Sequence, residues 1–166
     1  RTIEFYHQPS VMNAVGGVQE YRDFMASKAG TGPSTGPRTG LEETPAQPDW
    51  TSYWDRGYPT ALGGDYPAPM RQYWERFFEE VRQENPAARI LDIGSGNLGL
   101  SKIAREVSKE FELHAIDIAD IKSERIQDAA GIRFSRVPAE NTGFQDGLFG
   151  AVTGSYALEW TSMEST

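Results

Sequence analysis

The sequence contains no cysteine among its 166 residues. This absence excludes disulfides, thiolate metal sites and a cysteine nucleophile, and it is compatible with a reducing compartment, so we expect a cytoplasmic protein. No apolar run approaches the ~20 residues that a membrane-spanning helix needs, and no secretory signal is visible. We therefore expect a soluble protein with no membrane partner.

Positive charge is also scarce. Sixteen Lys and Arg residues stand against 24 Asp and Glu residues, which gives a formal net charge of −8. Nucleic-acid phosphates are bound by clustered basic residues, and no such cluster occurs here. We therefore expect no nucleic-acid partner, and the most plausible substrate is a small molecule. No group of His, Asp and Glu has the spacing of metal ligands, so no metal site is predicted.

Composition and hydrophobic pattern divide the chain into three parts. Residues 1–29 include a segment at 2–7 with strand-like alternation, and a segment at 18–25 that fits either a short helix or a second strand. Residues 30–48 are rich in Gly and Pro and are typical of a linker. Residues 49–166 carry the patterns of the main domain.

The main domain begins with aromatic residues and a long helix. Trp50 and Trp54 belong to an aromatic cluster that fits a packed N-terminal cap or a lid over a ligand. A helix is predicted from Pro69 because apolar residues recur at helical spacing, and Asn85, which precedes a proline, ends it. Strands at 90–93, 112–116, 132–137 and 149–153 then alternate with helices at 100–107 and 123–130. This alternation is typical of a parallel sheet with helices on its faces.

Three glycines, Gly94, Gly96 and Gly99, lie between the first of these strands and the next helix. Glycine permits positive φ and a close approach of a ligand to the backbone, at the sheet edge where such ligands bind. The alternative is a tight turn without a ligand, but one such turn does not need three glycines within six residues. The spacing also fits the dinucleotide fingerprint, so an NAD(P)-binding protein is a second hypothesis. Asp92 favours a cationic ligand instead, because a carboxylate there would repel a pyrophosphate.

A second acidic residue, Asp117, ends the following strand. A carboxylate at this position can accept hydrogen bonds from both ribose hydroxyls of an adenosine. The alternative is an ordinary surface acid at the start of a loop, and the pattern alone leaves both interpretations open.

Together these segments resemble a known family. Ile-Leu-Asp-Ile-Gly-Ser-Gly at 90–96 resembles the first motif of class I S-adenosylmethionine-dependent methyltransferases, and His-Ala-Ile-Asp at 114–117 resembles the second. The stretch 137–158 is similar to the third and fourth motifs of the small-molecule branch. The resemblance covers residues 53–160 approximately. It implies an α/β, Rossmann-like parallel sheet with an N-terminal helical cap, S-adenosyl-L-methionine as the cofactor, and a small-molecule or protein methyl acceptor.

The resemblance also implies which residues bind the cofactor. The methionine moiety would lie against Asp92 and the backbone around Gly94 and Gly96, and the ribose against Asp117. The remaining implied positions are Ser95 and Asn97 in the loop, Ile118 beside the adenine, Ala139 and Glu140 at its edge, and Ser155 and Tyr156 after the fourth strand. No catalytic residue is assigned, because methyl transfer from a sulfonium mainly requires alignment of donor and acceptor.

The chain departs from the family pattern in two ways. Leu98 stands where the family often has its third glycine, and Pro138 and Gly150 stand where acids are usual.

The family's sheet has seven strands, whereas the predicted strands here end with the fourth, so we expect an incomplete fold. Residues 1–29 could be a displaced C-terminal piece of that fold or a plain extension, and a second copy or a partner segment could complete the sheet. A noncatalytic donor-binding or scaffold fragment is therefore a third hypothesis.

Overall fold

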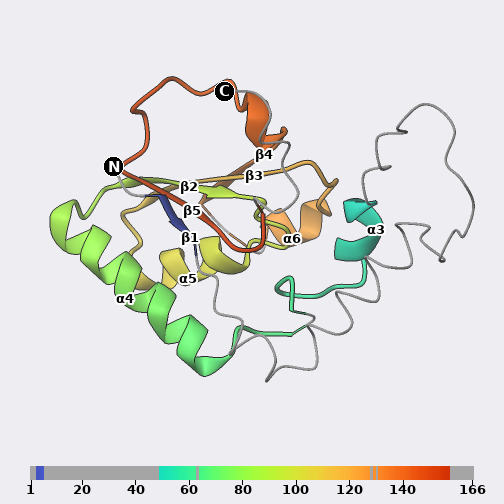
Figure 1. Cartoon of the computed structure of the whole chain (residues 1–166), viewed down its shortest axis with the longest axis horizontal. Coiled ribbons are helices and arrows are strands. Elements are labelled where there is room, and N and C mark those ends of the chain that lie inside the picture. Colours follow the sequence, from blue (N-terminus) through green and yellow to red (C-terminus); the bar gives the residue numbers. More distant parts are fainter. Residues whose placement is uncertain (1–2, 6–48, 63, 128, 130, 158–166) are drawn as a thin grey trace, which may run out of the picture.

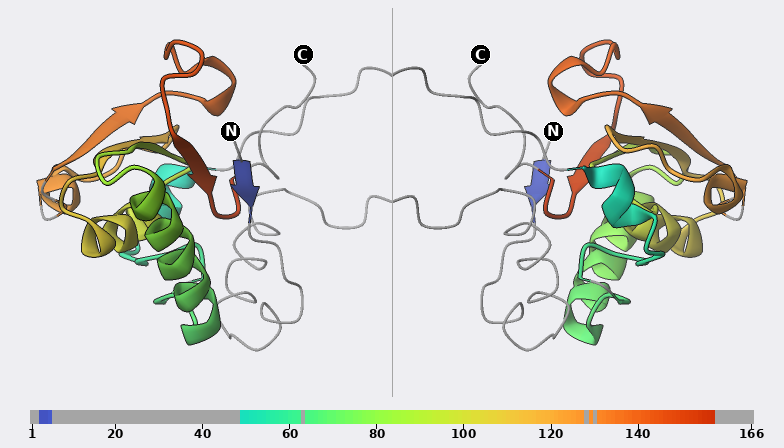
Figure 2. Two further views of the ribbon diagram at one scale, coloured as in Figure 1. Left: turned by 90° about the vertical axis from the view of Figure 1, so that its left-hand side faces the viewer. Right: turned by 90° about the vertical axis from the view of Figure 1, so that its right-hand side faces the viewer.

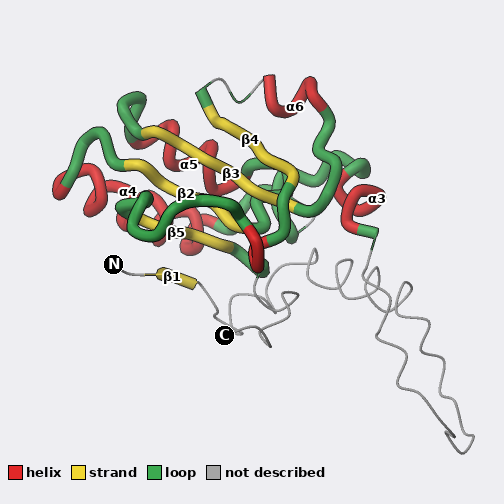
Figure 3. Tube along the Cα trace, turned by 90° about the horizontal axis from the view of Figure 1, so that it is seen from above, coloured by secondary structure: helices red, strands yellow, loops and turns green. Residues whose placement is uncertain are grey.

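The computed structural model describes residues 3–5, 49–62, 64–127, 129 and 131–157 (Figure 1). The predicted linker, the segment at 18–25 and the residues after 157 lie outside the described residues. Within the described part, five strands form one sheet in the order β1-β5-β2-β3-β4, and every neighbouring pair is parallel (Figure 3). The fold is therefore α/β with a parallel sheet, compatible with a Rossmann-like arrangement, as the sequence predicted.

The elements of the main domain follow the predicted alternation. The central strands are β2 (Arg89–Ile93), β3 (Glu112–Asp117), β4 (Ile132–Arg136) and β5 (Ala151–Gly154). The helices are α3 (Trp50–Trp54), α4 (Ala68–Glu84), α5 (Gly99–Val107) and α6 (Ser123–Gln127), with a 3₁₀ turn η1 at Ala139–Asn141. The predicted and observed ends mostly differ by one or two residues. The helix predicted at 123–130 ends at Gln127.

The long helix α4 forms for the reasons visible in its sequence. Pro69 lies in the first turn, where its missing N–H is not needed. Met70, Trp74 and Phe78 share one face at i, i+4 spacing and are fully buried. The helix ends at Asn85, whose extended backbone suits a residue before proline and whose N–H donates to the carbonyl of Val81 at 2.9 Å.

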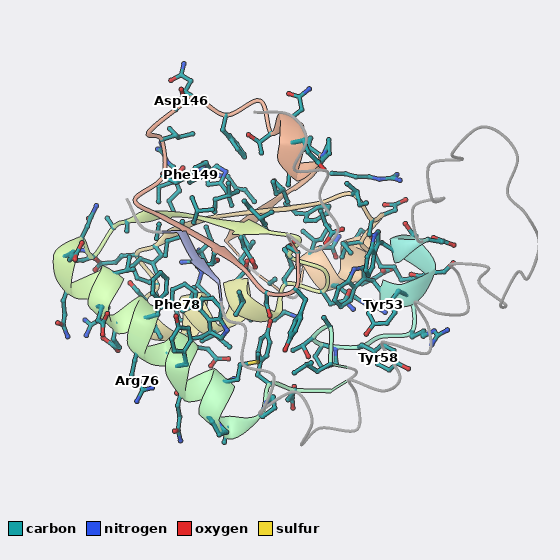
Figure 4. The ribbon with its side chains drawn as sticks, in the orientation of Figure 1. Tyr53, Tyr58, Arg76, Phe78, Asp146 and Phe149 are labelled. Carbon is teal, nitrogen blue, oxygen red and sulfur yellow. The ribbon has the colours of Figure 1, made fainter. Side chains whose placement is uncertain are left out.

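The two faces of the sheet are covered differently. Helices α4 and α5 lie below the sheet in Figure 1, and Ile90, Leu113 and Ala115 belong to the core cluster that includes α4 and α5 residues. Above the sheet runs the loop between β4 and β5, which brings Phe149 over the sheet (Figure 4). The ring of His114 on β3 contacts Phe149, with ring centres 5.4 Å apart. The His114 ring therefore packs beneath this loop and lines neither of the cavities described below.

The edge of the sheet beyond β5 is occupied by a segment from the start of the chain. Strand β1 (Ile3–Phe5) lies within the stretch 2–7 predicted to be a strand, and its backbone pairs in parallel with 152–154 of β5 (Figure 2). None of the described helices is both long enough and apolar enough to cross a membrane.

Candidate functional site

Strands β2, β3 and β5 end at one end of the sheet, near α3 and η1 (Figure 3). Residues that follow these strands line a cleft there. We call it the outer cleft. It encloses about 740 Å³ of atom-free space, its open mouth included. A smaller inner pocket adjoins it and shares Trp54, Ala61, Gly94 and Ser155 with it. Parallel sheets bind ligands at this edge, so the cleft is the candidate site.

The structure brings together most of the residues implied by the family resemblance. The outer cleft is lined by Gly94, Asp117, Ile118, Ala139, Glu140, Ser155 and Tyr156. The inner pocket adds Asp92 and Ser95. Gly96 and Asn97 line neither cavity. Nearly all of these positions thus converge on one end of the sheet, although they come from four separate loops.

Asp92 lines the inner pocket and is 3% exposed. One carboxylate oxygen, Oδ2, accepts hydrogen bonds from the Ser101 hydroxyl at 2.6 Å and the Ser101 backbone N–H at 3.1 Å. Burial raises the pKa of Asp92 to about 7, an effect that these bonds oppose and that the nearby Asp117 reinforces. A cation in the inner pocket would favour the ionised form.

Asp117 lies at the end of β3 and borders the outer cleft. Its two oxygens accept backbone hydrogen bonds at 2.8 Å, Oδ2 from Gly96 and Oδ1 from Ala119. Burial raises the pKa of Asp117, and these backbone donors work against the rise. A carboxylate oxygen can accept more than one hydrogen bond, so Asp117 keeps acceptor capacity toward the cleft.

The glycines of the loop are required by contacts within the protein. Gly94 and Gly96 have φ of +61° and +48°. A Cβ on Gly94 would lie 2.4 Å from Cβ of Ala157, and a Cβ on Gly96 would lie 2.2 Å from Cζ2 of Trp54. Leu98 also has positive φ, 66°, although it is not glycine. The turn therefore keeps the left-handed geometry at the position where the family often has glycine.

Two buried hydroxyls in the inner pocket have no hydrogen-bond partner within the described part of the chain. These are Oγ of Ser95 and Oγ of Ser155, each with no partner among the described residues. Burial raises the pKa of the Tyr66 hydroxyl, and the nearby Ser155 side chain opposes this rise. A buried polar group without a partner costs about 1–3 kcal/mol, so a small polar group that reaches these hydroxyls would be favoured.

The cap, by which we mean α3 and the residues up to Leu62 that follow it, contributes residues that the sequence did not assign to the site. Trp50 and Trp54 of α3 and the nearby Ala61 form one wall of the outer cleft. Their aromatic cluster was visible in the sequence, where it fitted either a packed cap or a lid over a ligand. The structure shows both packing and cleft lining, because the Trp54 ring covers Gly96 and also borders both cavities.

No Lys, Arg or His lines the outer cleft or the inner pocket among the described residues, whereas Asp92, Asp117 and Glu140 do. The described parts of the chain also contain no group of three or more His, Asp or Glu side chains placed to hold a metal ion.

No protein-family model matches the chain, and a search of curated proteins gives no significant match.

Proposed function

We propose that the outer cleft and inner pocket together bind S-adenosyl-L-methionine, and that the chain is the donor-binding part of a methyltransferase for a small-molecule or protein acceptor. The observation that carries this proposal is a set of acidic side chains, with no basic one among the described lining residues, around a cleft at the carboxyl edge of a parallel sheet. S-adenosylmethionine carries a sulfonium cation and an α-ammonium group and has no phosphate, so it matches that charge better than a pyrophosphate does.

The same loop is poorly suited to the pyrophosphate of a dinucleotide. Such a site offers free backbone N–H groups to the phosphates. Here the N–H of Ser95 donates to the carbonyl of Ile116 at 3.0 Å, and the N–H of Gly96 donates to Asp117. The indole of Trp54 fills the space beside Gly96 that a close-lying phosphate would need. The NAD(P) hypothesis is therefore the weaker one.

The residues of the two cavities fit the parts of the proposed cofactor. Asp92, Ser95 and Ser155 would hold the amino acid end, since they offer a carboxyl group and two unpaired hydroxyls. Asp117 would hold the ribose hydroxyls, and the side chain of Ile118, which is 36% exposed, would lie against the adenine. When bound, this cofactor supplies an electrophilic methyl group on a sulfonium.

The walls of the cleft would then orient the ligand and keep water away from it. Trp50 and Trp54 present aromatic side chains, and such faces stabilise a nearby cation. Alignment and exclusion of water are the main requirements of a direct methyl displacement, so the proposal needs no general base among these residues.

Removal of the Asp117 carboxylate tests the proposal. We expect Asp117→Ala to weaken binding of S-adenosylhomocysteine by roughly 1–3 kcal/mol, a rise in Kd of about 5- to 150-fold, through loss of charge-assisted hydrogen bonds. Asp120→Ala is the matched control, because this exposed acid lies three residues away and lines neither cavity. Calorimetric titration measures both. Equal affinities of the Asp117→Ala and wild-type chains would remove Asp117 from the site.

A further inference from the structure

The cap is joined to the glycine loop through the side chain of Asn97. Its Nδ2 donates to the carbonyl of Trp54 at 3.2 Å and to the carbonyl of Tyr58 at 2.5 Å. Its Oδ1 accepts a hydrogen bond from Nη1 of Arg125 at 2.7 Å. Both N–H donors of the amide are therefore used on the cap. This explains why Asn97, although it lies in the loop, does not line the cleft.

Arg125 binds the same point of the cap from α6. It belongs to α6, and its Nη1 also donates to the carbonyl of Trp54, while its Nη2 lies 3.5 Å from the carbonyl of Asp55. These carbonyls are at the C-terminal end of α3, where a cation is favourable. Within the described residues Arg125 forms no ion pair with a carboxylate, so its hydrogen bonds are given to backbone carbonyls and to Asn97.

The residue held in this way is the one that borders both cavities. The Trp54 side chain is 6% exposed, packs on Gly96 and makes an edge contact with the Tyr53 ring at a centre-to-centre distance of 5.0 Å. Both Asn97 and Arg125 bind the carbonyl oxygen of Trp54. Because this oxygen is fixed from two directions, the backbone at Trp54 is fixed, and so is the point from which its ring extends.

We propose that Asn97 and Arg125 form a latch that positions Trp54 at the junction of the outer cleft and the inner pocket. Both are positioning residues, since neither lines a cavity. The inference rests on the proposed function, because it concerns how a ligand that occupies both cavities is bound. A ligand confined to the outer cleft touches only part of the Trp54 surface. Release of the latch should therefore weaken a ligand that spans the junction more than one that does not.

The test uses the full chain with Arg125→Ala, Arg125→Lys and, as a matched control, Arg76→Ala. Arg76 lies on the exposed side of α4, far from the cleft (Figure 4). We expect Arg125→Ala to raise the Kd of S-adenosylhomocysteine about tenfold, which is within the range for residues that act without touching a ligand. The Kd of adenosine should rise less than threefold. Arg125→Lys, which keeps the charge and one donor group, should recover part of the affinity, and the control should match the wild type.

A spectroscopic measurement reports the position of Trp54 without any ligand. The fluorescence of Trp54 is the difference between a chain and the same chain with Trp54→Phe, and we compare this difference with and without Arg125→Ala. We expect Arg125→Ala to shift the Trp54 emission to the red and to make the Trp54 ring more accessible to acrylamide.

An unchanged Trp54 emission, or an unchanged Kd for S-adenosylhomocysteine in a folded Arg125→Ala chain, would overturn the latch. An equal loss of adenosine and S-adenosylhomocysteine binding would also overturn it, since that pattern indicates general loosening. If the Ala variant does not fold, Arg125→Lys decides by the same two measurements. Failure of the wild type to bind S-adenosylhomocysteine would instead refute the proposed function and, with it, the role of the latch in donor binding.

Discussion

Replacement of Asp92 by Asn should make the protein more stable above neutral pH. Asp92 is 3% exposed, and burial raises its pKa from 3.8 to about 7. Between these values the folded chain holds a proton that the unfolded chain has already lost. Unfolding then releases a proton, so the stability that Asp92 contributes decreases as the pH rises from about 4 to about 7 and is constant above that.

The size of the effect follows from the difference between the two pKa values. A rise from 3.8 to about 7 is about three pH units, and one unit corresponds to about 1.4 kcal/mol, so ionised Asp92 destabilises the fold by at most about 4 kcal/mol. Asn has the same shape, can still accept the hydrogen bonds from Ser101 and does not ionise. The Asp92→Asn variant therefore does not lose this stability as the pH rises.

Urea unfolding at pH 5 and pH 8 measures the effect. Relative to the wild type, the free energy of unfolding of Asp92→Asn should be about 2–3 kcal/mol higher at pH 8 than it is at pH 5. Asp65→Asn, at an exposed position, should show no such movement. Parallel pH profiles of the Asp92→Asn and wild-type chains would refute the reasoning. A gain in stability together with weaker donor binding would show that the carboxylate serves function at the expense of stability.

Three further changes have expected outcomes that urea unfolding can check. Gly96→Ala should destabilise the fold by roughly 2–4 kcal/mol, because the new Cβ would meet the Trp54 ring at 2.2 Å in a left-handed backbone; wild-type stability would contradict that packing. Leu98→Gly should destabilise the fold by roughly 1–3 kcal/mol, because the lost burial of the leucine side chain outweighs the ~1–2 kcal/mol of backbone strain that glycine relieves at positive φ. A more stable variant would show that the backbone strain is the larger of the two effects. Glu112→Gln should lower stability at pH 7 but not near pH 2. Hydrogen bonds from Arg89 lower the pKa of Glu112 to about 2, so the stability that Glu112 contributes is lost as the pH falls from about 4.5 to about 2. A stability difference between the variant and the wild type that persists at pH 2 would contradict this.

The fold of the main domain was predictable because its signals are local. The burial of Met70, Trp74 and Phe78 follows from helical spacing, and the parallel sheet follows from alternating strand and helix patterns. The convergence of Asp92 and Asp117 on one edge follows from the same topology, since both lie at or near the ends of parallel strands.

The contacts that shape the site were not predictable in this way, because they join distant segments. Asn97 meets the carbonyl of Trp54 across 43 positions, and Arg125 meets Asn97 across 28. No short-range pattern marks an arginine that binds backbone carbonyls of a distant helix. The glycine at 96 was also ambiguous, since its spacing suggests ligand contact whereas the structure shows a neighbouring indole. Leu98 shows the reverse case, in which left-handed geometry persists without the glycine that usually signals it.

The most direct test of the central claim is a pair of calorimetric titrations of the full chain, one with S-adenosylhomocysteine and one with NADH. The acidic cleft and the committed N–H groups of the glycine loop predict saturable one-to-one binding of S-adenosylhomocysteine and no binding of NADH. Binding of NADH without binding of S-adenosylhomocysteine would contradict the account.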